Sequence, residues 1–507
     1  MSAQSKSITV SRLFTVFPAV LFCVICICQA GEDDVQFKKN PYVQNITPTS
    51  AVIMWEFSKP AEAVLAVENR KMPCPESRLH EIGVTGLEPG TVYTYSVNGV
   101  LSGRFRTFPA ERNAAVKFVI YGDTRSAPRS HARVVSAIKN SQPLFIVHSG
   151  DFVSRGTAAG QWDEQYFAPL QNIIGNVPVF TAVGNHERLS PLYHAYFSQP
   201  GNERYYSFDA GCVHVVVLDS MIRDLDGIRK QSEWLEKDLA ANTASWTFAV
   251  LHHLPLSRRA AGLSMIELNE YVPVLFKYGV QFVFAGHDHY YKRTEPFVHE
   301  GSALTFIISA GGGAPLRKLK AKEKEEWEAA AHSVYHFCSI DAAPDAVSIK
   351  AVDTKGVCID NLSLTKKDYH AYVQKGREFA AVIPQRRELL KRIYLDDYDE
   401  INETVSFTFA SDPKPGKTVS VRMTALSNPF DEALRFRLTW KTDKTSWKIS
   451  PENADLTVHP GKSASVQFKA VIGDKTEPFP TVSYEAVFSG KKKGRGTIRI
   501  SGRNSAY

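Results

Sequence analysis

The sequence predicts a layered α/β domain with an all-β sandwich domain on its N-terminal side and another on its C-terminal side. Its 507 residues exceed the size of one ordinary globular domain. In the middle of the chain, apolar strand runs alternate with helical stretches, whereas both flanks carry short strands of alternating polarity. A hydrophobic content of 44% with 22% charged residues is typical of globular proteins and excludes a collagenous, low-complexity or wholly disordered chain.

The N-terminus has the pattern of a secretory signal peptide over residues 1–30. Lys6 and Arg12 come before or at the start of an apolar run over residues 13–28, and the tripeptide Cys-Gln-Ala at 28–30 provides a cleavage site. An uncleaved anchor helix is the alternative, although the run falls short of the about 20 residues that span a bilayer. We therefore expect a secreted, periplasmic or cell-surface protein, with no membrane span after signal cleavage.

Residues 36–110 predict the first β-sandwich. Alternating strand patterns at 51–55 and 92–97 are separated by Pro and Gly turn signals at 86–90. Trp55 and the tyrosine-rich second strand resemble a fibronectin type III-like module, in which the tryptophan fills the core.

Residues 115–365 predict the α/β domain. The apolar strand runs are at 116–120, 144–147, 213–218, 247–251 and 281–285. Helical stretches such as 130–138 and 231–240 lie between them, which favours buried strands covered by helices. Polar clusters follow several of these strands. Because ligands of such sheets bind where strand ends open into loops, we expect the clusters to converge there.

The rest of the chain predicts a connector and a second sandwich. Residues 366–400 are strongly charged and compatible with helix. Alternating strand patterns return in residues 401–507, which we interpret as a C-terminal Ig-like β-sandwich. Nothing in the sequence identifies a partner for this sandwich.

The charge balance gives no sign of a nucleic-acid partner. Sixty basic and 53 acidic residues leave a formal net charge of +7, which is mild for this length. The basic runs at 318–324 and 491–495 lack interleaved aromatic side chains, which indicates solvated surface.

The cysteines do not indicate a disulfide scaffold. Four lie beyond the signal segment: Cys74, Cys212, Cys338 and Cys358. Cys338 and Cys358 flank a predicted hairpin, so a disulfide between them is one option in an oxidising compartment. Cys212, inside an apolar run, is expected to be a buried free thiol.

Five polar clusters stand at or just after the apolar strands. They are Gly122-Asp123-Thr124-Arg125, Gly150-Asp151, Gly184-Asn185-His186-Glu187, His252-His253 and Gly286-His287-Asp288-His289. Each cluster alone is typical of a turn. Together they offer carboxylates, an amide and imidazoles without a thiolate, a set that suits two divalent or trivalent first-row ions rather than a structural zinc.

Glycine begins four of these clusters, and the last one carries two spaced histidines. A residue without a Cβ lets the chain turn sharply off a strand. If the run at 286–289 is extended, His287 and His289 point to one side and Asp288 points to the other. The two imidazoles can then each bind a different ion of a close pair.

This ordered set of clusters resembles the calcineurin-like metallophosphoesterases, and in particular the purple acid phosphatases, which also carry a fibronectin-like N-terminal domain. The resemblance covers roughly residues 40–360 and extends to the run at 234–239 and to Tyr290 and Arg293. It does not cover the C-terminal sandwich. It implies a metallophosphoesterase fold for the α/β domain.

The resemblance also implies roles for individual residues. Asp151 would bridge two metal ions, here Fe, Mn or Zn. Asp123 and His289 would bind the first ion. The second ion would be bound by Asn185, His252 and His287. His186 would face the substrate as proton donor, with a structural histidine as the alternative.

Two positions depart from the family pattern. Purple acid phosphatases have a tyrosine ligand where this chain has Ser154, and many other metallophosphoesterases have a histidine where it has Arg125. His131 is a candidate for the ligand that is missing from both positions. Arg125 is expected either to contact the phosphate or to form a structural salt bridge.

A further group of residues is expected beside the ligands. His253 follows His252 and would point away from it along an extended segment, so we expect it next to the metal ligands or in contact with substrate. Arg258, Arg259 and Lys292 are candidates for the rim of the cleft.

The resulting functional hypothesis is hydrolysis of phosphate monoesters by a metal-activated hydroxide, with His186 as proton donor. The substrate would be a small phosphate ester. A phosphodiesterase or nucleotide hydrolase of the same superfamily is the first alternative, because the same metals serve either ester. A catalytically inactive binding protein is the second alternative.

Overall fold

The computed structural model describes most of the chain beyond residue 34. It covers residues 35–396, apart from 188–189, 223 and 260, and residues 405–499, apart from 410–415, 426–427, 429, 442–445, 472, 474–480 and 489–492. Within these ranges no helix is long and apolar enough to cross a membrane. The signal peptide expected at 1–30 lies outside the described residues and stays a prediction.

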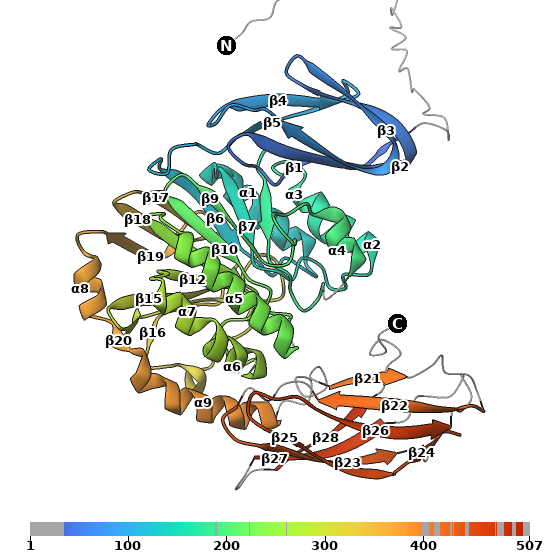
Figure 1. The fold of residues 1–507 in the computed structure, drawn as a ribbon. Helices are drawn as coiled ribbons and strands as arrows, with labels where there is room; N and C mark the ends of the chain where they lie inside the picture. Colours follow the sequence, from blue (N-terminus) through green and yellow to red (C-terminus); the bar gives the residue numbers. More distant parts are fainter. Residues whose placement is uncertain are drawn as a thin grey trace, which may run out of the picture.

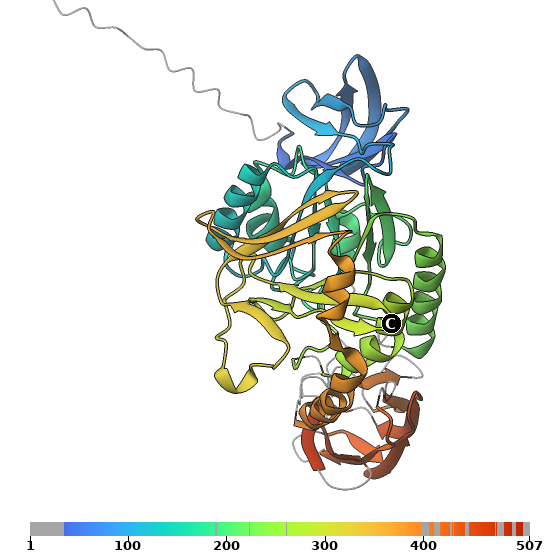
Figure 2. The same cartoon turned by 90° about the vertical axis from the view of Figure 1, so that its left-hand side faces the viewer.

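Three parts follow one another along the long axis of the molecule (Figures 1 and 2). An N-terminal antiparallel sheet is followed by a central α/β part with two sheets. Two helices then lead to a C-terminal pair of four-stranded sheets. The predicted fold class, a layered α/β domain between two β domains, is confirmed.

The N-terminal sheet contains five strands. They are β1 (Phe37–Gln44), β2 (Ser50–Val67), β3 (Arg70–Thr85), β4 (Val92–Val97) and β5 (Leu101–Arg106). Strand β2 pairs with β1 at one end, with β4 at the other and with β3 along its length, with register shifts between Glu56 and Ala61. One long irregular strand therefore joins all pairings into a single sheet. Trp55 is fully buried and stacks on His80, as a core residue should.

The first sheet of the central part has six strands in the order β19-β18-β17-β6-β7-β8. Their bounds are β6 (Val116–Tyr121), β7 (Phe145–His148), β8 (Val179–Thr181), β17 (His336–Ala343), β18 (Ala346–Asp353) and β19 (Cys358–Thr365). Strands β6, β7 and β8 are parallel to one another. Their carboxyl ends therefore meet at one edge of the sheet.

The second central sheet has nine strands, seven of them in the order β16-β13-β15-β12-β11-β10-β9, with β14 paired to β15 and β20. The bounds are β9 (Tyr206–Ala210), β10 (Val213–Val217), β11 (Trp246–Leu251), β12 (Phe282–Ala285), β13 (Tyr291–Thr294), β14 (Phe297–His299), β15 (Ser302–Ser309), β16 (Glu328–His332) and β20 (Arg377–Glu378). Strands β10, β11, β12 and β15 are parallel.

The two sheets pack face to face and helices cover their outer faces. Phe118 of β6 meets Phe248 of β11 with ring centroids 5.1 Å apart. Val119, the next residue along β6, belongs instead to the cluster on the outer side. This alternation places one apolar layer between the sheets and one under each set of helices.

The helices fall into two groups. Beside the six-stranded sheet are α1 (Pro128–Ser141), α2 (Ala159–Gln161), the π-helical turn at Trp162–Phe167, α3 (Ala168–Leu170) and α4 (Pro191–Tyr196). Beside the nine-stranded sheet are α5 (Leu225–Ala241), α6 (Ala261–Glu270) and α7 (Val272–Lys277).

The connector contains α8 (Tyr369–Gln374) and α9 (Phe379–Asp396). Phe379 of α9 packs on Phe276 and Phe297 of the central part, and Tyr394 packs on Phe430 of the C-terminal part. Helix α9 therefore contacts both parts through aromatic side chains.

The C-terminal part contains two four-stranded sheets. One has the order β21-β22-β26-β24 and the other β25-β23-β27-β28. The bounds are β21 (Val405–Phe409), β22 (Thr418–Ala425), β23 (Leu434–Lys441), β24 (Lys448–Ser450), β25 (Asn453–Val458), β26 (Ala464–Val471), β27 (Thr481–Phe488) and β28 (Lys493–Arg499). Trp440 of one sheet contacts Phe468 of the other edge-on at 4.9 Å.

The disulfide considered between Cys338 and Cys358 is absent, since both residues are free cysteines. Cys338 of β17 is fully buried, whereas Cys358 of β19 is exposed, and β18 lies between these two strands. The thiols are thus on strands that are not neighbours. Cys212 is buried and free, as expected.

A buried histidine gives the central fold a defined dependence on pH. His214 of β10 hydrogen-bonds Asp209 of β9 at 2.7 Å and Asp238 of α5 at 2.9 Å. Although burial lowers it, the pKa of His214 is raised to about 9 by these two carboxylates. His214 therefore stays protonated at neutral pH, and its two hydrogen bonds connect strand β10 to strand β9 and to helix α5.

We predict that this ionic contact stabilises the fold fully below about pH 6.5 and that the contribution disappears as the pH rises through about 9. His214→Gln should lower the free energy of unfolding by on the order of 2 kcal/mol at pH 6. The difference from wild type should shrink towards pH 10 in urea denaturation series. A difference that stays constant with pH would contradict the proposed charge on His214.

Candidate metal centre

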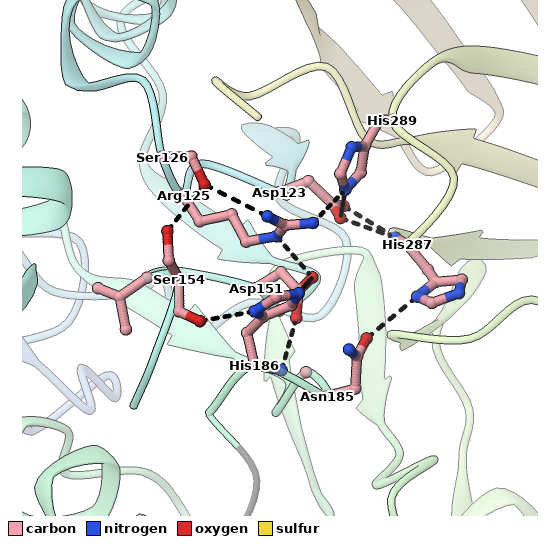
Figure 3. A network of polar contacts seen from close by, with 12 residues as sticks. Asp123, Arg125, Ser126, Asp151, Ser154, Asn185, His186, His287 and His289 are labelled. Carbon is pink, nitrogen blue, oxygen red and sulfur yellow. Dashed lines mark hydrogen bonds and ion pairs between the residues drawn. The ribbon is translucent and has the colours of Figure 1, made fainter. Parts of the chain in front are cut away.

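The polar clusters of five strands converge at one place. Strands β6, β7 and β8 of one sheet lead into Asp123, Asp151 and Asn185. Strands β11 and β12 of the other sheet lead into the histidines at 252 and 287. The loops of both sheets therefore bring these side chains together at a shared edge (Figure 3).

The backbone at this edge is strained. Asp123, Asp151, His287 and His289 all have positive φ angles, of 59°, 60°, 70° and 56°. Residues with a Cβ adopt this left-handed region rarely, and such strain concentrates at functional sites. The run at 286–289 is thus not extended, which corrects the assumption made from the sequence. The two histidines nevertheless reach different ligand groups.

Glycines make room for the close approach of the loops. A Cβ added to Gly184 would lie 2.4 Å from the backbone nitrogen and a carboxylate oxygen of Asp151. A Cβ on Gly286 would lie 2.5 Å from Oδ2 of Asp123. Both distances are far below van der Waals contact, so these two positions require glycine for space rather than for a turn.

The first ligand group consists of Asp123, Asp151 and His289, all buried. Asp123 Oδ1 lies 3.3 Å from His289 Nε2. His289 Nδ1 donates to the carbonyl oxygen of Pro315 at 3.0 Å. The carbonyl fixes the proton on Nδ1, so the Nε2 lone pair faces the carboxylates, as a metal ligand requires.

The second ligand group consists of His252, His253 and His287. Asn185 Oδ1 lies 3.1 Å from both His252 Nε2 and His287 Nδ1. His252 Nδ1 donates to the carbonyl oxygen of Ser149 at 2.8 Å, which again turns Nε2 inwards. Burial lowers the pKa of His287 well below its ordinary value, so its imidazole is in the neutral form that binds metals.

His253 was expected next to the metal ligands, and one of its ring nitrogens lies within 4.8 Å of ring nitrogens of His252 and His287. The expectation assumed an extended segment, whereas β11 ends at Leu251 and the chain bends at 252–253. His253 Nδ1 hydrogen-bonds Ser220 Oγ at 2.9 Å, and the His253 ring lies 4.6 Å from the ring of His287.

Asp151 stands between the two groups. Its Oδ1 lies 3.4 Å from His252 Nε2, and its Oδ2 lies 3.3 Å from Nε of Arg125. The side chain is 1% exposed. Burial alone would raise the pKa of Asp151, but its electrostatic interactions with His252, His186 and Arg125 lower it below its ordinary range. The carboxylate is therefore ionised and able to face two cations.

His186 lies beside Asp151 and remains partly accessible. Its backbone N–H donates to Asp151 Oδ1 at 3.0 Å, and its Nδ1 donates to the carbonyl oxygen of Ser154 at 2.7 Å. Nε2 is 3.8 Å from Asp151 Oδ2, and 28% of the side chain is exposed. The ring is thus held at one nitrogen and free to act at the other.

Arg125 and Ser154, the two departures from the family pattern, are connected. The Arg125 guanidinium donates to Asp151 Oδ2, to His289 Nε2 at 3.3 Å and to Ser126 Oγ at 3.2 Å. Ser126 Oγ is 2.8 Å from Ser154 Oγ, which also donates to Gln165 Oε1. Figure 3 shows the guanidinium between the first ligand group and this serine pair.

His131 does not belong to either ligand group. Its Nδ1 donates to the carbonyl oxygen of Gln165 at 2.9 Å, and its Nε2 lies 3.1 Å from the Tyr121 hydroxyl. Burial lowers the pKa of His131 to about 4, so it is a neutral core side chain. Both ring nitrogens already have partners, which argues against its role as the missing ligand.

Sequence reasoning gave no role to Glu187. This buried carboxylate accepts the backbone N–H groups of Asp151, Phe152, Val153 and Gly184. It therefore ties the loop after β7 to the loop after β8. The only sequence feature that could have indicated this role of Glu187 is its position directly after His186. A glutamate in a turn is too common to predict such a role.

The donor chemistry of the two groups fits two divalent cations. In each group the ligand atoms lie within 4.8 Å of one another. One group is rich in carboxylate and the other in imidazole, both of which bind first-row ions. Asp151 is close enough to both to be shared.

Comparisons with known proteins agree with this arrangement. The calcineurin-like phosphoesterase family model matches residues 116–291. Purple acid phosphatase 15 of Arabidopsis thaliana is 27% identical over 288 residues, 46% of this chain and 53% of that protein. Acid phosphatase type 7 of Mus musculus is 26% identical over 253 residues, 43% of this chain and 57% of that protein. The chain spans about half the length of these relatives.

Two solved structures share the fold. A purple acid phosphatase from yellow lupin seeds has a TM-score of 0.55 at 19% identity, covering 65% of this chain and 75% of that chain. A PhoD structure has a TM-score of 0.52 at 11% identity, covering 70% and 97%. On this fold, the two ligand groups are consistent with a binuclear metal site. Residues 116–291 match the calcineurin-like phosphoesterases, and the chain, which also carries an N-terminal β domain, is similar to purple acid phosphatases over about half its length.

We predict that Glu187→Gln weakens the centre without touching a ligand. An amide directs two N–H hydrogens at a site that offers only N–H donors, so at least one hydrogen bond is lost. The free energy of unfolding should fall by about 1–3 kcal/mol, and metal content should fall with it. Glu233→Gln, at an exposed position of α5, is the matched control. Unchanged stability and metal content in Glu187→Gln would contradict the assigned role.

Proposed function

We propose that this protein hydrolyses phosphate monoesters with two bound metal ions, drawn from Fe, Mn or Zn. The observation that carries the proposal is the position of Asp151, a buried carboxylate that faces both ligand groups. Two-metal sites in which one ligand is shared are typical of phosphoester hydrolysis. The relationship to purple acid phosphatases supports the monoester class.

The bound ions would supply an activated water and neutralise charge on the phosphoryl oxygens. Asp123, Asp151 and His289 would hold one ion. Asn185, His252 and His287 would hold the other, with His253 beside them. The carbonyl oxygens that orient His252 and His289 keep the ligand nitrogens turned inwards before any ion binds.

His186 would protonate the leaving alkoxide. The carbonyl oxygen of Ser154 holds Nδ1, and this leaves Nε2 to carry the transferred proton. Burial lowers the pKa of His186, while the neighbouring Asp151 partly offsets this effect. The protonated donor is therefore populated in acidic solution, which suits an acid phosphatase.

Arg125 would contact the phosphoryl group. Its guanidinium is 16% exposed and already reaches Asp151 and His289. If Asp151 and His289 bind a metal ion instead, the Arg125 N–H groups become free. A guanidinium can then donate two parallel hydrogen bonds to two phosphoryl oxygens.

We predict that His186→Ala lowers turnover of p-nitrophenyl phosphate by about 10²–10⁴-fold, the usual contribution of a general acid. Metal content, measured by elemental analysis, should stay close to wild type, because His186 is not in either ligand group. Loss of both metals in the variant would make His186 a ligand and refute its role as proton donor.

A substrate panel tests the ester class. Purified protein loaded separately with Mn, Zn, Fe or Mg should hydrolyse p-nitrophenyl phosphate faster than bis(p-nitrophenyl) phosphate, most strongly with Mn, Zn or Fe. The reverse preference would establish the phosphodiesterase or nucleotide hydrolase alternative. Absence of hydrolysis with every metal would favour a binding protein.

A further inference from the structure

A cavity of about 580 Å³ lies against the loop that carries two metal ligands. Asp288, which lies between His287 and His289 in the chain, is one of its lining residues. The buried Asp288 side chain accepts hydrogen bonds from Tyr290 and Ser257. The cavity has the size of a small-molecule site, and the mechanism proposed above does not use it.

The lining of this cavity carries excess positive charge. Its basic residues are Arg258, Arg259, Lys292, Lys318, Lys320, Lys324 and Arg386. Its acidic residues are Asp288, Glu323, Glu325 and Glu328. Seven positive and four negative charges leave a balance of +3. The cavity should therefore attract anions.

The acidic residues are already paired with particular cations. Glu325 pairs with both Arg258, at 3.1 Å, and Arg386, at 2.8 Å. Glu328 pairs with Lys292 at 2.6 Å. Among the ion pairs of the described residues, none involves Lys318 or Lys324. Within the described part of the chain, these two lysines carry positive charge without an ion-pair partner.

Arg317 connects the cavity to the metal centre. Its backbone N–H donates to the carbonyl oxygen of His289 at 3.2 Å, and the next residue, Lys318, lines the cavity. The Arg317 guanidinium interacts electrostatically with Arg259 on the cavity side and with Arg125 and Asp123 on the metal side. It is half-buried, and the ion pairs found between described residues do not include it. Arg317 thus interacts with charged residues of both the cavity and the metal centre.

We infer that the cavity binds a second anionic group of the substrate, so that preferred substrates are phosphate monoesters whose leaving group itself carries a phosphate or carboxylate. This inference rests on the proposed phosphatase function for the identity of the reacting group. The scissile phosphate would lie at the metal centre, and the second anion would contact Lys318 and Lys324 in the cavity. Such a contact stabilises the bound substrate and the transition state equally. It should therefore lower KM and leave kcat nearly unchanged.

The test compares three esters of one sugar: glucose 1-phosphate, glucose 1,6-bisphosphate and glucuronic acid 1-phosphate. We expect kcat/KM for at least one doubly anionic ester to exceed that for glucose 1-phosphate about tenfold or more, mainly through KM. The two doubly anionic esters distinguish a phosphate from a carboxylate site. A ratio near one for both, with glucose 1-phosphate still hydrolysed, would overturn the inference and leave the proposed function intact.

The double variant Lys318→Ala/Lys324→Ala should reduce that ratio at least fivefold, while kcat for glucose 1-phosphate stays within twofold of wild type. The control Lys350→Ala/Lys367→Ala removes the same charge from exposed positions that do not line the cavity, and it should keep the ratio. An equal loss in both variants would reduce the effect to net charge and overturn the inference.

A binding measurement keeps the inference testable if no ester is hydrolysed. Calorimetric titration of chelator-treated protein should show glucose 1,6-bisphosphate binding at least tenfold more tightly than glucose 1-phosphate. The difference should be lost in Lys318→Ala/Lys324→Ala. Equal affinities for both esters would overturn the cavity's role, whereas a preference without hydrolysis would refute only the phosphatase proposal.

Discussion

The structure of the centre depends on one buried carboxylate. Asp151 lies where the loops of the six-stranded and nine-stranded sheets meet, and its two oxygens face groups contributed by different sheets. A buried ionised carboxylate is costly unless cations or N–H groups surround it. The imidazoles, Arg125 and the His186 N–H meet this need. The charge of Asp151 therefore explains why so many polar groups converge on one edge.

The rest of the fold compensates for the strain that this convergence requires. Four residues at the centre have left-handed backbone, and glycines stand where loops approach within contact distance. Each such backbone conformation costs about 1 kcal/mol or more and persists only in a rigid environment. Two buried sheets, with an apolar layer between them and another under each set of helices, provide that environment. The loops themselves contribute Glu187, which ties two of them together.

The order of strands and the ligand types could be predicted from the sequence, because apolar runs followed by polar clusters are local patterns. The loop conformations could not. The direction of the His253 side chain follows from a bend after β11 rather than from alternation along a strand, so the sequence could not predict its orientation. His131 has the residue type of a ligand, but the core encloses it. Glu187 and Arg317 act through contacts with residues remote in the chain, which no local pattern reveals.

Arg125 and Ser154, the two positions that depart from the expected family pattern, are connected through Ser126. Ser154, at the position where a tyrosine ligand was expected, shares a hydrogen bond with Ser126. Ser126 Oγ accepts a hydrogen bond from the Arg125 guanidinium, which also donates to Asp151 Oδ2. The two substitutions are thus compatible with each other and change the carboxylate group together. The permanent positive charge of Arg125 lies at the first ligand group. A metal ion that binds this group must therefore share Asp151 and His289 with Arg125, whereas the second ligand group has no such competitor among its members.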